Sequence, residues 1–288
     1  MKNKNRTHYW YFLLVVLVLI STGSAQQKQK QQGNKPSLYS TLWALTAVEY
    51  DASTSTVYKS AMLLLKAASE DTTWSAALEQ KHDLSDPTIS ISLIPAVVLD
   101  VDETVLSNAQ FFAKLMRDDE QIARQSFDNW VAEANATALS GVIEYIKEAK
   151  HLGIAVIYVT NRACKKRDGN NDPCPQRTDT IKNLVKAGLP PLGPDDLVLL
   201  RNQQTDWTGD KSIRRAFICE KYRILQVFGD NLGDFAPKLG ASGMTPDQRK
   251  EEIKQYQDKW GSKWFMLPNP IYGTWLNALG DDPDEYLK

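Results

Sequence analysis

The stretch that decides the fold reads Ala96-Val97-Val98-Leu99-Asp100-Val101-Asp102-Glu103-Thr104, an apolar run closed by two aspartates one residue apart. The apolar run favours a strand buried on both faces, and side chains at positions i and i+2 of a strand point the same way. Asp100 and Asp102 therefore face a common point. At a separation of ~6 Å and an effective dielectric constant of ~20, their repulsion is about 3 kcal/mol. The pair indicates a bound cation, a shared proton or a function.

Expected strands and helices alternate along the rest of the chain. Apolar runs predict buried strands over residues 154–160, 197–200 and 224–228, and helical spacing of apolar residues predicts helices over 40–69, 121–134, 141–150, 177–187 and 211–222. These units predict an α/β fold, a Rossmann-like, mainly parallel sheet with helices on both faces. The helical segment 36–94 is expected to act as a small cap packed on a main domain that spans residues 95–288.

Polar side chains follow three of the expected strands, at the edge where such a sheet binds its ligand. The first strand ends at the aspartate pair, the second at Thr160 and Asn161, and the fourth at a run that contains Asp230 and Asp234. Each signal alone is weak, because Gly-Asp-Asn is a common turn and Thr-Asn often caps a helix. Together, four carboxylates, a hydroxyl and an amide suit a hard divalent cation, and Mg²⁺ fits them better than zinc.

The amino terminus has the layout of a secretory signal. Lys2, Lys4 and Arg6 precede an apolar run over residues 9–20, and small residues follow up to Ala25. As a helix this run would be ~18 Å long, short of a ~30 Å hydrocarbon core, so a cleaved signal over residues 1–25 is expected, and no stable membrane span. Residues 26–35 are expected to be a flexible lead-in. The sequence predicts an exported protein, periplasmic or secreted.

Charge and cysteine content narrow the classes of partner. The formal net charge is −1, and removal of the basic signal makes it more negative, so no basic stripe indicates a nucleic-acid polymer as partner. The cysteines, Cys164, Cys174 and Cys219, lie far from the signal, which argues against a lipoprotein. The sequence leaves open whether Cys164 and Cys174 form a disulfide, and Cys219 has the surroundings of a buried thiol. The oligomeric state is also open.

Four motifs resemble those of the haloacid dehalogenase-like superfamily. They are Asp100 to Thr104, Thr160 to Arg162, Lys211 with Arg214 and Arg215, and Gly229 to Phe235. The fuller strings Asp102-Glu103-Thr104-Val105-Leu106 and Gly229 to Phe235 are similar to one branch, the secreted class C acid phosphatases, which are related to bacterial surface 5′-nucleotidases. The early helices and residues 267–275 also resemble this branch, so the likeness covers most of the mature chain.

The resemblance implies catalytic and metal-binding roles for the acidic residues. Asp100 would attack phosphorus to form an aspartyl-phosphate, and Asp102 would protonate the leaving alcohol and then activate water. The carboxylates of Asp100 and Asp230 and the backbone carbonyl of Asp102 would hold Mg²⁺, and Asp234 would complete the metal site directly or through water.

The resemblance also implies residues that bind the substrate. Thr160, the Asn161 backbone and Lys211 would bind the phosphoryl oxygens. Trp130 and Tyr272 are candidates for stacking on a base, a contact worth ~1–3 kcal/mol, although aromatic residues are most often part of a core. Arg214 and Arg215 are expected to be structural or surface groups.

Two features depart from the branch. Ser107 stands before Asn108, where members often have an aspartate, and residues 163–176 form a longer connection than expected after the second motif. This connection carries Lys165, Lys166 and Arg167 beside the expected phosphate site. We hypothesise that it helps to recruit anionic substrates.

The sequence therefore predicts a secreted Mg²⁺-dependent acid phosphatase acting on small phosphomonoesters, with nucleoside 5′-monophosphates as the leading substrates. Sugar or other small organic phosphates are the alternative substrates. A non-catalytic storage or binding protein is an alternative of another class, but it predicts a damaged nucleophile, whereas Asp100 and Asp102 are both present. A dehalogenase is disfavoured, because expulsion of halide needs no proton donor at Asp102.

Overall fold

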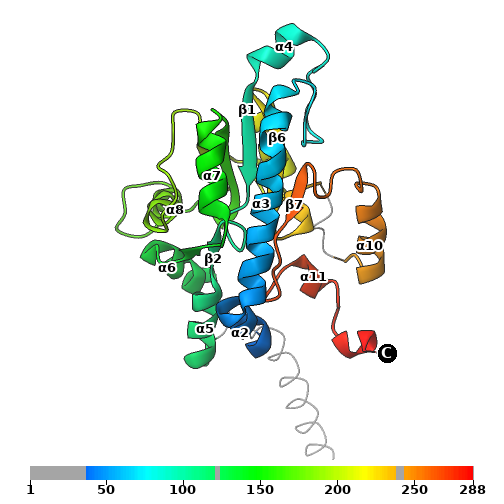
Figure 1. Cartoon of the computed structure of the whole chain (residues 1–288). Coiled ribbons are helices and arrows are strands. Elements are labelled where there is room, and N and C mark those ends of the chain that lie inside the picture. Colours follow the sequence, from blue (N-terminus) through cyan, green and yellow to red (C-terminus); the bar gives the residue numbers. More distant parts are fainter. Residues whose placement is uncertain (1–36, 121–123, 238–242, 288) are drawn as a thin grey trace, which may run out of the picture.

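A five-stranded parallel sheet forms the centre of the computed structural model, which describes residues 37–120, 124–237 and 243–287 (Figure 1). The strand order is β5-β4-β1-β6-β7, with β1 in the middle and every neighbour parallel. The strands are β1 (Ile94–Leu99), β4 (Ala155–Ala163), β5 (Leu197–Arg201), β6 (Tyr222–Gly229) and β7 (Trp264–Met266). The Rossmann-like α/β fold is confirmed. The predicted signal and lead-in lie outside the described residues.

Both faces of β1 are buried, as its apolar sequence predicts. Val97 and Leu99 enter one hydrophobic cluster, and Ala96 and Val98 enter the other. Successive side chains of a strand alternate between faces, so an uninterrupted apolar run can serve two cores at once. The strand therefore ends, at Asp100, in a part of the molecule where a carboxylate is buried to 8% exposure.

Helices cover both faces of the sheet. Figure 1 shows α3 and α7 in front of β1, and Tyr58 of α3 and Tyr145 of α7 pack in the cluster that contains Leu99. Ile218 of α9 packs in the opposite cluster. The helices are α2 (Leu38–Thr46), α3 (Val48–Glu70), α4 (Pro87–Ser92), α5 (Ala109–Arg117), α6 (Arg124–Glu133), α7 (Val142–His151), α8 (Pro175–Lys186), α9 (Ser212–Cys219), α10 (Pro246–Lys254) and α11 (Thr274–Asn277).

The helical stretch expected over residues 40–69 consists of two helices, α2 and α3. Ala47 between them is extended, with φ −83° and ψ 123°, and its N–H donates to the Trp43 carbonyl to end α2. No glycine or proline marks this break. The interruption lets α2 contact α5 while α3 contacts α7 and β6. Tertiary packing, rather than local sequence, separates the two helices.

Other elements are shorter than expected or were not expected. The helix predicted over 211–222 ends at Cys219, because the chain enters β6 at Tyr222. The helix predicted over 121–134 is α6, and residues 121–123 lie outside the described residues. The edge strand β7, the helix α5 and the short antiparallel pair β2 (Leu106–Ser107) and β3 (Thr137–Ala138) were not predicted. Short 3₁₀ turns, η1 (Leu232–Asp234) and η2 (Pro283–Tyr286), complete the fold.

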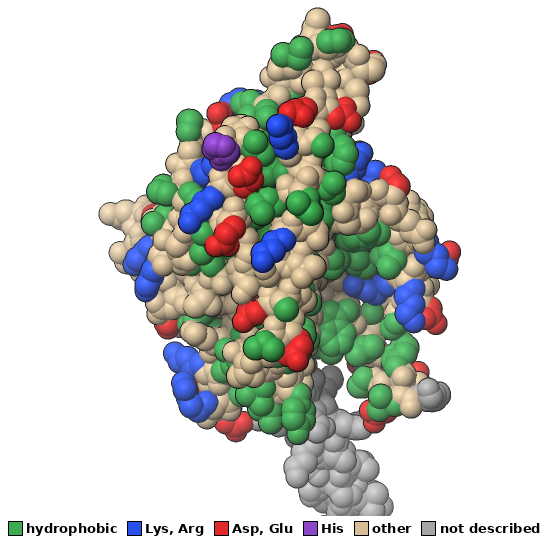
Figure 2. All heavy atoms as spheres, viewed as in Figure 1, with side chains coloured by type: hydrophobic (Ala, Val, Ile, Leu, Met, Phe, Trp, Pro, Cys, Tyr) green, Lys and Arg blue, Asp and Glu red, His purple; other side chains and the backbone are tan. Residues whose placement is uncertain are grey.

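Charges of both signs are interspersed over the face shown in Figure 2. Within the described ranges, none of the helices combines the length and the apolar character that a membrane crossing requires.

Candidate active site

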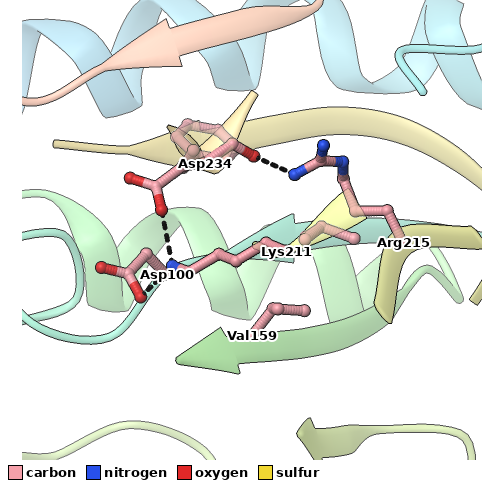
Figure 3. A pocket seen from close by; sticks show the side chains of 7 residues that line it. Asp100, Val159, Lys211, Arg215 and Asp234 are labelled. Atoms are coloured by element: carbon pink, nitrogen blue, oxygen red, sulfur yellow. Dashed lines mark hydrogen bonds and ion pairs between the residues drawn. The ribbon is translucent and has the colours of Figure 1, made fainter. Parts of the chain in front are cut away.

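Asp100, Lys211 and Asp234 form a buried ion cluster at the carboxyl end of β1 (Figure 3). The Lys211 Nζ lies 2.5 Å from Asp100 Oδ1 and 2.6 Å from Asp234 Oδ1. Burial raises the pKa of Asp100 to about 7, although the charge of Lys211 opposes this shift. Burial also works against the charge on Lys211, but the two carboxylates raise its pKa above the usual value. Lys211 is thus a fixed cation between two carboxylates.

Glycine at position 229 allows Asp234 to approach the end of β6. A Cβ at this position would lie 2.3 Å from Asp234 Oδ2 and 2.4 Å from Asp234 Cβ, distances that real side chains do not show. Asp234 Oδ2 accepts a 2.9 Å hydrogen bond from the Asn231 N–H, which closes the turn. The glycine of the Gly-Asp-Asn turn is therefore required for the position of the Asp234 carboxylate.

The carboxylates of Asp100, Asp230 and Asp234 fit a metal ion. One oxygen of each lies within 4.8 Å of the others, and Asp230 Oδ2 accepts a 2.8 Å hydrogen bond from the amide of Asn269. Burial and the neighbouring charges of Asp234 and Asp100 raise the pKa of Asp230 well above its usual value. Three carboxylates face one ammonium group, so the cluster lacks positive charge. All-oxygen ligands of this kind suit a hard divalent cation.

The Asp102 carboxylate is bound by Arg162, whereas Lys211 binds Asp100 and Asp234. The Arg162 Nε lies 3.1 Å from both Asp102 oxygens, and Nη2 lies 2.8 Å from Oδ1. Arg162 is itself buried and donates from Nη1 to Thr180 at 3.1 Å. Asn108 donates to Asp102 Oδ1 at 2.9 Å. Two planar donors therefore fix the orientation of the Asp102 carboxylate.

Thr160 and Asn161 lie beside Asp102 and are held by Arg214. The Thr160 hydroxyl lies 3.5 Å from Asp102 Oδ2. Arg214 donates to the Thr160 carbonyl at 2.6 Å and to Asn161 Oδ1 at 2.7 Å, and it is fully buried. Arg214 is thus a structural group. Lys211, expected to bind the phosphoryl oxygens together with these two residues, contacts Asp100 and Asp234.

Trp130 and Tyr272 are both tied to the turn that follows the aspartates. The indole N–H of Trp130 donates to Asn108 Oδ1 at 2.8 Å, and the hydroxyl of Tyr272 donates to Glu103. Burial raises the pKa of Glu103 to about 7, and the charge of Asp102 adds to the shift. Trp130 is 7% exposed, whereas Tyr272 is only partly buried, so Tyr272 offers more free ring surface to a substrate.

The connection after β4, residues 163–176, contacts α6 through ion pairs. Cys164 and Cys174 form a disulfide with Cα atoms 4.9 Å apart, which resolves the pairing left open by the sequence, and Cys219 is a buried free thiol as expected. Arg167 donates to both oxygens of Asp128 at 3.0 Å and also pairs with Asp179. Lys165 lies 3.5 Å from Asp128. Lys165 and Arg167 therefore have carboxylate partners and attach the connection to α6, whereas Lys166 is exposed.

The sequence reasoning gave no role to several residues of the site. Arg162 belongs to the second motif, Asn108 follows Ser107, and Asn269 lies within residues 267–275, but nothing in their spacing indicates their contacts. Arg215, expected as structural or surface, is buried between Glu79 and the Asp234 carbonyl, at 2.7 Å from each. These partners lie 136 and 19 residues away along the chain, so only the fold shows the contacts.

An aspartate directly after the central strand of a Rossmann-like sheet, with a lysine and further aspartates around it, defines a protein of the haloacid dehalogenase-like (HAD) superfamily. The family model for HAD superfamily, subfamily IIIB (Acid phosphatase), matches residues 27–275. The chain belongs to this family, whose members are phosphomonoesterases that use a metal.

Individual relatives agree with this assignment. The class C acid phosphatase from Bacillus anthracis, solved with tungstate bound, is 30% identical and superposes with a TM-score of 0.66 over 85% of this chain and 88% of that one. Acid phosphatase 1 of Solanum lycopersicum is 29% identical over 181 residues, 61% of this chain and 57% of its own length. The stem 28 kDa glycoprotein of Glycine max is 27% identical over 180 residues, 61% of this chain and 58% of its own. The chain thus spans less than two thirds of the curated relatives it matches.

Proposed function

We propose that the mature chain is an exported, Mg²⁺-dependent phosphomonoesterase with nucleoside 5′-monophosphates as its leading substrates. The observation that carries the proposal is the buried carboxylate of Asp100, with Lys211 at 2.5 Å and Asp102 oriented separately by Arg162. One carboxylate is available as a nucleophile and another as an acid and base, a division that phosphate ester hydrolysis through a covalent intermediate requires. The tungstate in the Bacillus anthracis relative is an oxyanion, as phosphate is.

Asp100 and Asp102 have separate roles in the proposed reaction. The Asp100 carboxylate attacks phosphorus in line, the bond to the leaving oxygen breaks, and Asp102 gives its proton to that oxygen. Asp102 then takes a proton from water, which attacks the aspartyl-phosphate and releases phosphate. Asp100, Asp230 and Asp234, with the Asp102 backbone carbonyl, would hold Mg²⁺, which would neutralise part of the negative charge when the carboxylate approaches the phosphate.

Other side chains bind and orient the phosphoryl group. Thr160 and the Asn161 backbone offer donors at the end of β4, fixed there by Arg214. Lys211 keeps its charge because of the carboxylates around it, and it is close enough to Asp100 to stabilise the phosphoryl oxygens. Tyr272 would stack on the base of a nucleotide.

The test is phosphate release from a chromogenic monoester, with Mg²⁺ and with chelator, by the parent and by Asp100→Asn. Asp281→Asn is the matched control, because Asp281 is an exposed aspartate near the carboxyl terminus. The parent and Asp281→Asn should turn over with Mg²⁺ only, and Asp100→Asn should be inactive. Turnover in chelator, or by Asp100→Asn at the parental rate, would refute the mechanism.

Substrate identity requires a separate measurement. Rates on a panel of nucleotides and sugar phosphates, with the parent and with Tyr272→Leu, separate the leading substrates from the alternative. A base contact predicts a loss for nucleotides that is larger than the loss for sugar phosphates. Absence of release on every substrate, with metal still bound, would favour the non-catalytic alternative.

A further inference from the structure

Two arginines near the site lack acidic partners. Arg201 is the last residue of β5, and Arg124 is the first residue of α6. Within the part of the chain that the structure describes, neither guanidinium forms a hydrogen bond or an ion pair, and Arg201 Nε is buried with no partner. A buried donor that leaves water without a partner costs about 1–3 kcal/mol. A bound water, an ion or a ligand can satisfy such a group. Arg214 and Arg223 also have an unpartnered Nε, but their other guanidinium nitrogens donate to protein oxygens, whereas those of Arg201 do not within the described residues.

The exposed Arg124 on α6 and the partly buried Arg201 on β5 are linked through the connection that follows β4. Arg124 and Asp128 are four residues apart on α6 and therefore share one face of the helix. That face meets the connection after β4, because Asp128 holds Arg167 and Gln176. The same connection is attached to β5, since the Cys164 N–H donates to the Arg201 carbonyl at 2.8 Å. Burial lowers the pKa of Arg201, and the charge of Arg124 lowers it further.

The pair lies one strand away from the residues expected to bind the phosphoryl group. In the ladder between β4 and β5, Thr160 pairs with Leu200 and Ala163 pairs with Arg201. Neighbouring strands are ~4.8 Å apart. The charge of Arg201 is also felt at Arg214, which holds Thr160 and Asn161. An anion between Arg124 and Arg201 would thus lie within the length of a small substrate from the reacting phosphate.

Arg167, on the connection between β4 and α8, differs from Arg124 and Arg201 because it has acidic partners. Arg167 receives carboxylates from both Asp128 and Asp179, and although burial opposes the shift, hydrogen bonds from Arg167 and Gln176 lower the pKa of Asp128. Among residues 37–120, 124–237 and 243–287, acidic partners are therefore present for Arg167 and absent for Arg124 and Arg201. Two unpaired guanidinium groups present planar donors that match the oxygens of a phosphate or a carboxylate.

We propose that Arg124 and Arg201 bind a second anionic group on the substrate, so that this protein prefers phosphomonoesters that carry another phosphate or a carboxylate. This inference rests on the proposed function and extends it to the substrate class. One arginine comes from α6 and the other from the sheet, and α6 and α8 lie side by side in Figure 1. A doubly anionic substrate would therefore connect α6 to the sheet as it binds.

The test compares matched substrate pairs with Mg²⁺ at 0.15 M salt, where long-range attraction is screened. The pairs are adenosine 5′-monophosphate with adenosine 3′,5′-bisphosphate, fructose 6-phosphate with fructose 1,6-bisphosphate, and glycerol 3-phosphate with 3-phosphoglycerate. The readout is the ratio of the two kcat/KM values within a pair. Because both values are measured on the same preparation, the ratio does not depend on how much of the enzyme is active. The parent should prefer the doubly anionic member of at least one pair, and the pair that responds distinguishes phosphate from carboxylate.

In Arg201→Met and Arg124→Met this preference should fall about tenfold or more. Lys250→Met, which removes an exposed charge on α10, is the control and should keep the parental ratio. The inference is overturned if the parent shows no preference in any pair, or if both arginine variants keep it. Dissociation constants for the same pairs, measured by calorimetry in an Asp100→Asn background, give the ratio without turnover. They separate failure of this inference from failure of the proposed reaction.

Discussion

Replacement of Gly229 by alanine should displace Asp234 without disturbing the sheet. The new Cβ would lie 2.3 Å from Asp234 Oδ2, and ordinary contact begins at 3.4 Å, so the carboxylate has to retreat by about 1 Å. Asp234 Oδ1 lies 2.6 Å from Lys211 Nζ. The same retreat would lengthen this contact to roughly 3.6 Å, which is beyond hydrogen-bond range.

The expected losses follow from this displacement. Overpacking of a buried site should lower the free energy of unfolding by about 1–3 kcal/mol. Loss of a charge-assisted hydrogen bond and of a well-placed carboxylate, about 3 kcal/mol together, should lower kcat/KM by about 100-fold. The Mg²⁺ concentration for half-maximal activity should rise by about 10–100-fold, as it does when support for a ligand is lost.

Three measurements on Gly229→Ala test this reasoning: urea unfolding, phosphate release and the Mg²⁺ dependence of release. Gly193→Ala is the matched control, because a Cβ there meets its nearest atom, Asp196 Oδ2, at 3.5 Å, an ordinary contact. If Gly229→Ala keeps the parental kcat/KM and the parental Mg²⁺ dependence, the close approach of Asp234 is not what the site requires.

Three further results are expected. Arg162→Met should slow hydrolysis of alkyl phosphates more than that of aryl phosphates, because poor leaving groups depend most on proton donation by an oriented Asp102. The control is Arg223→Met, at a buried arginine that binds the carbonyls of Ala68, Asp71 and Trp74, and it should slow both classes equally. Equal effects of Arg162→Met on both classes would contradict the role of Arg162 in orienting Asp102. Burial raises the pKa of Cys219 to about 12, so a thiol reagent at pH 8 should label no thiol in the native protein. It should label one thiol after unfolding and three after unfolding with a reductant. Labelling of three thiols without reductant would exclude the Cys164–Cys174 disulfide. Burial raises the pKa of Asp100 and of Glu103 to about 7, above their unfolded values of 3.8 and 4.5. The metal-free folded state therefore binds more protons than the unfolded state, and its free energy of unfolding should fall as pH rises from about 4 to 7. An increase in the free energy of unfolding over this range, measured with urea, would contradict this prediction.

The edge of the sheet that carries the site could be predicted from the sequence, because strand topology alone brings strand ends together. The apolar run before Asp100 and the polar residues after the other strands were enough to gather Asp230, Asp234 and Thr160 at one edge. The partners of Asp102 could not be predicted in this way. Arg162 is two residues beyond Thr160 in an extended strand, and which carboxylate it reaches depends on the twist and packing of the sheet.

The same limit applies to elements whose existence depends on packing. The break at Ala47 carries no local signal, since alanine is a strong helix former. Strand β7 has three residues, too few for an alternation to stand out, and it forms because β6 offers an open edge beside it. The contact of Lys211 with Asp234 likewise depends on the absence of a side chain at Gly229.

The central place of β1 has a consequence for how the chain folds. Both partners of this strand come later in the sequence, since Ala96 pairs with Ala155 on one side and with Ile224 on the other. Until β6 is added, the Val-Val-Leu run presents an unpaired edge, the kind of surface on which chains aggregate. Pairings so distant in sequence also form slowly. A chain that stops before Tyr222 would therefore expose the apolar run of β1 and would also lack Asp230 and Asp234, half of the four aspartates of the candidate site.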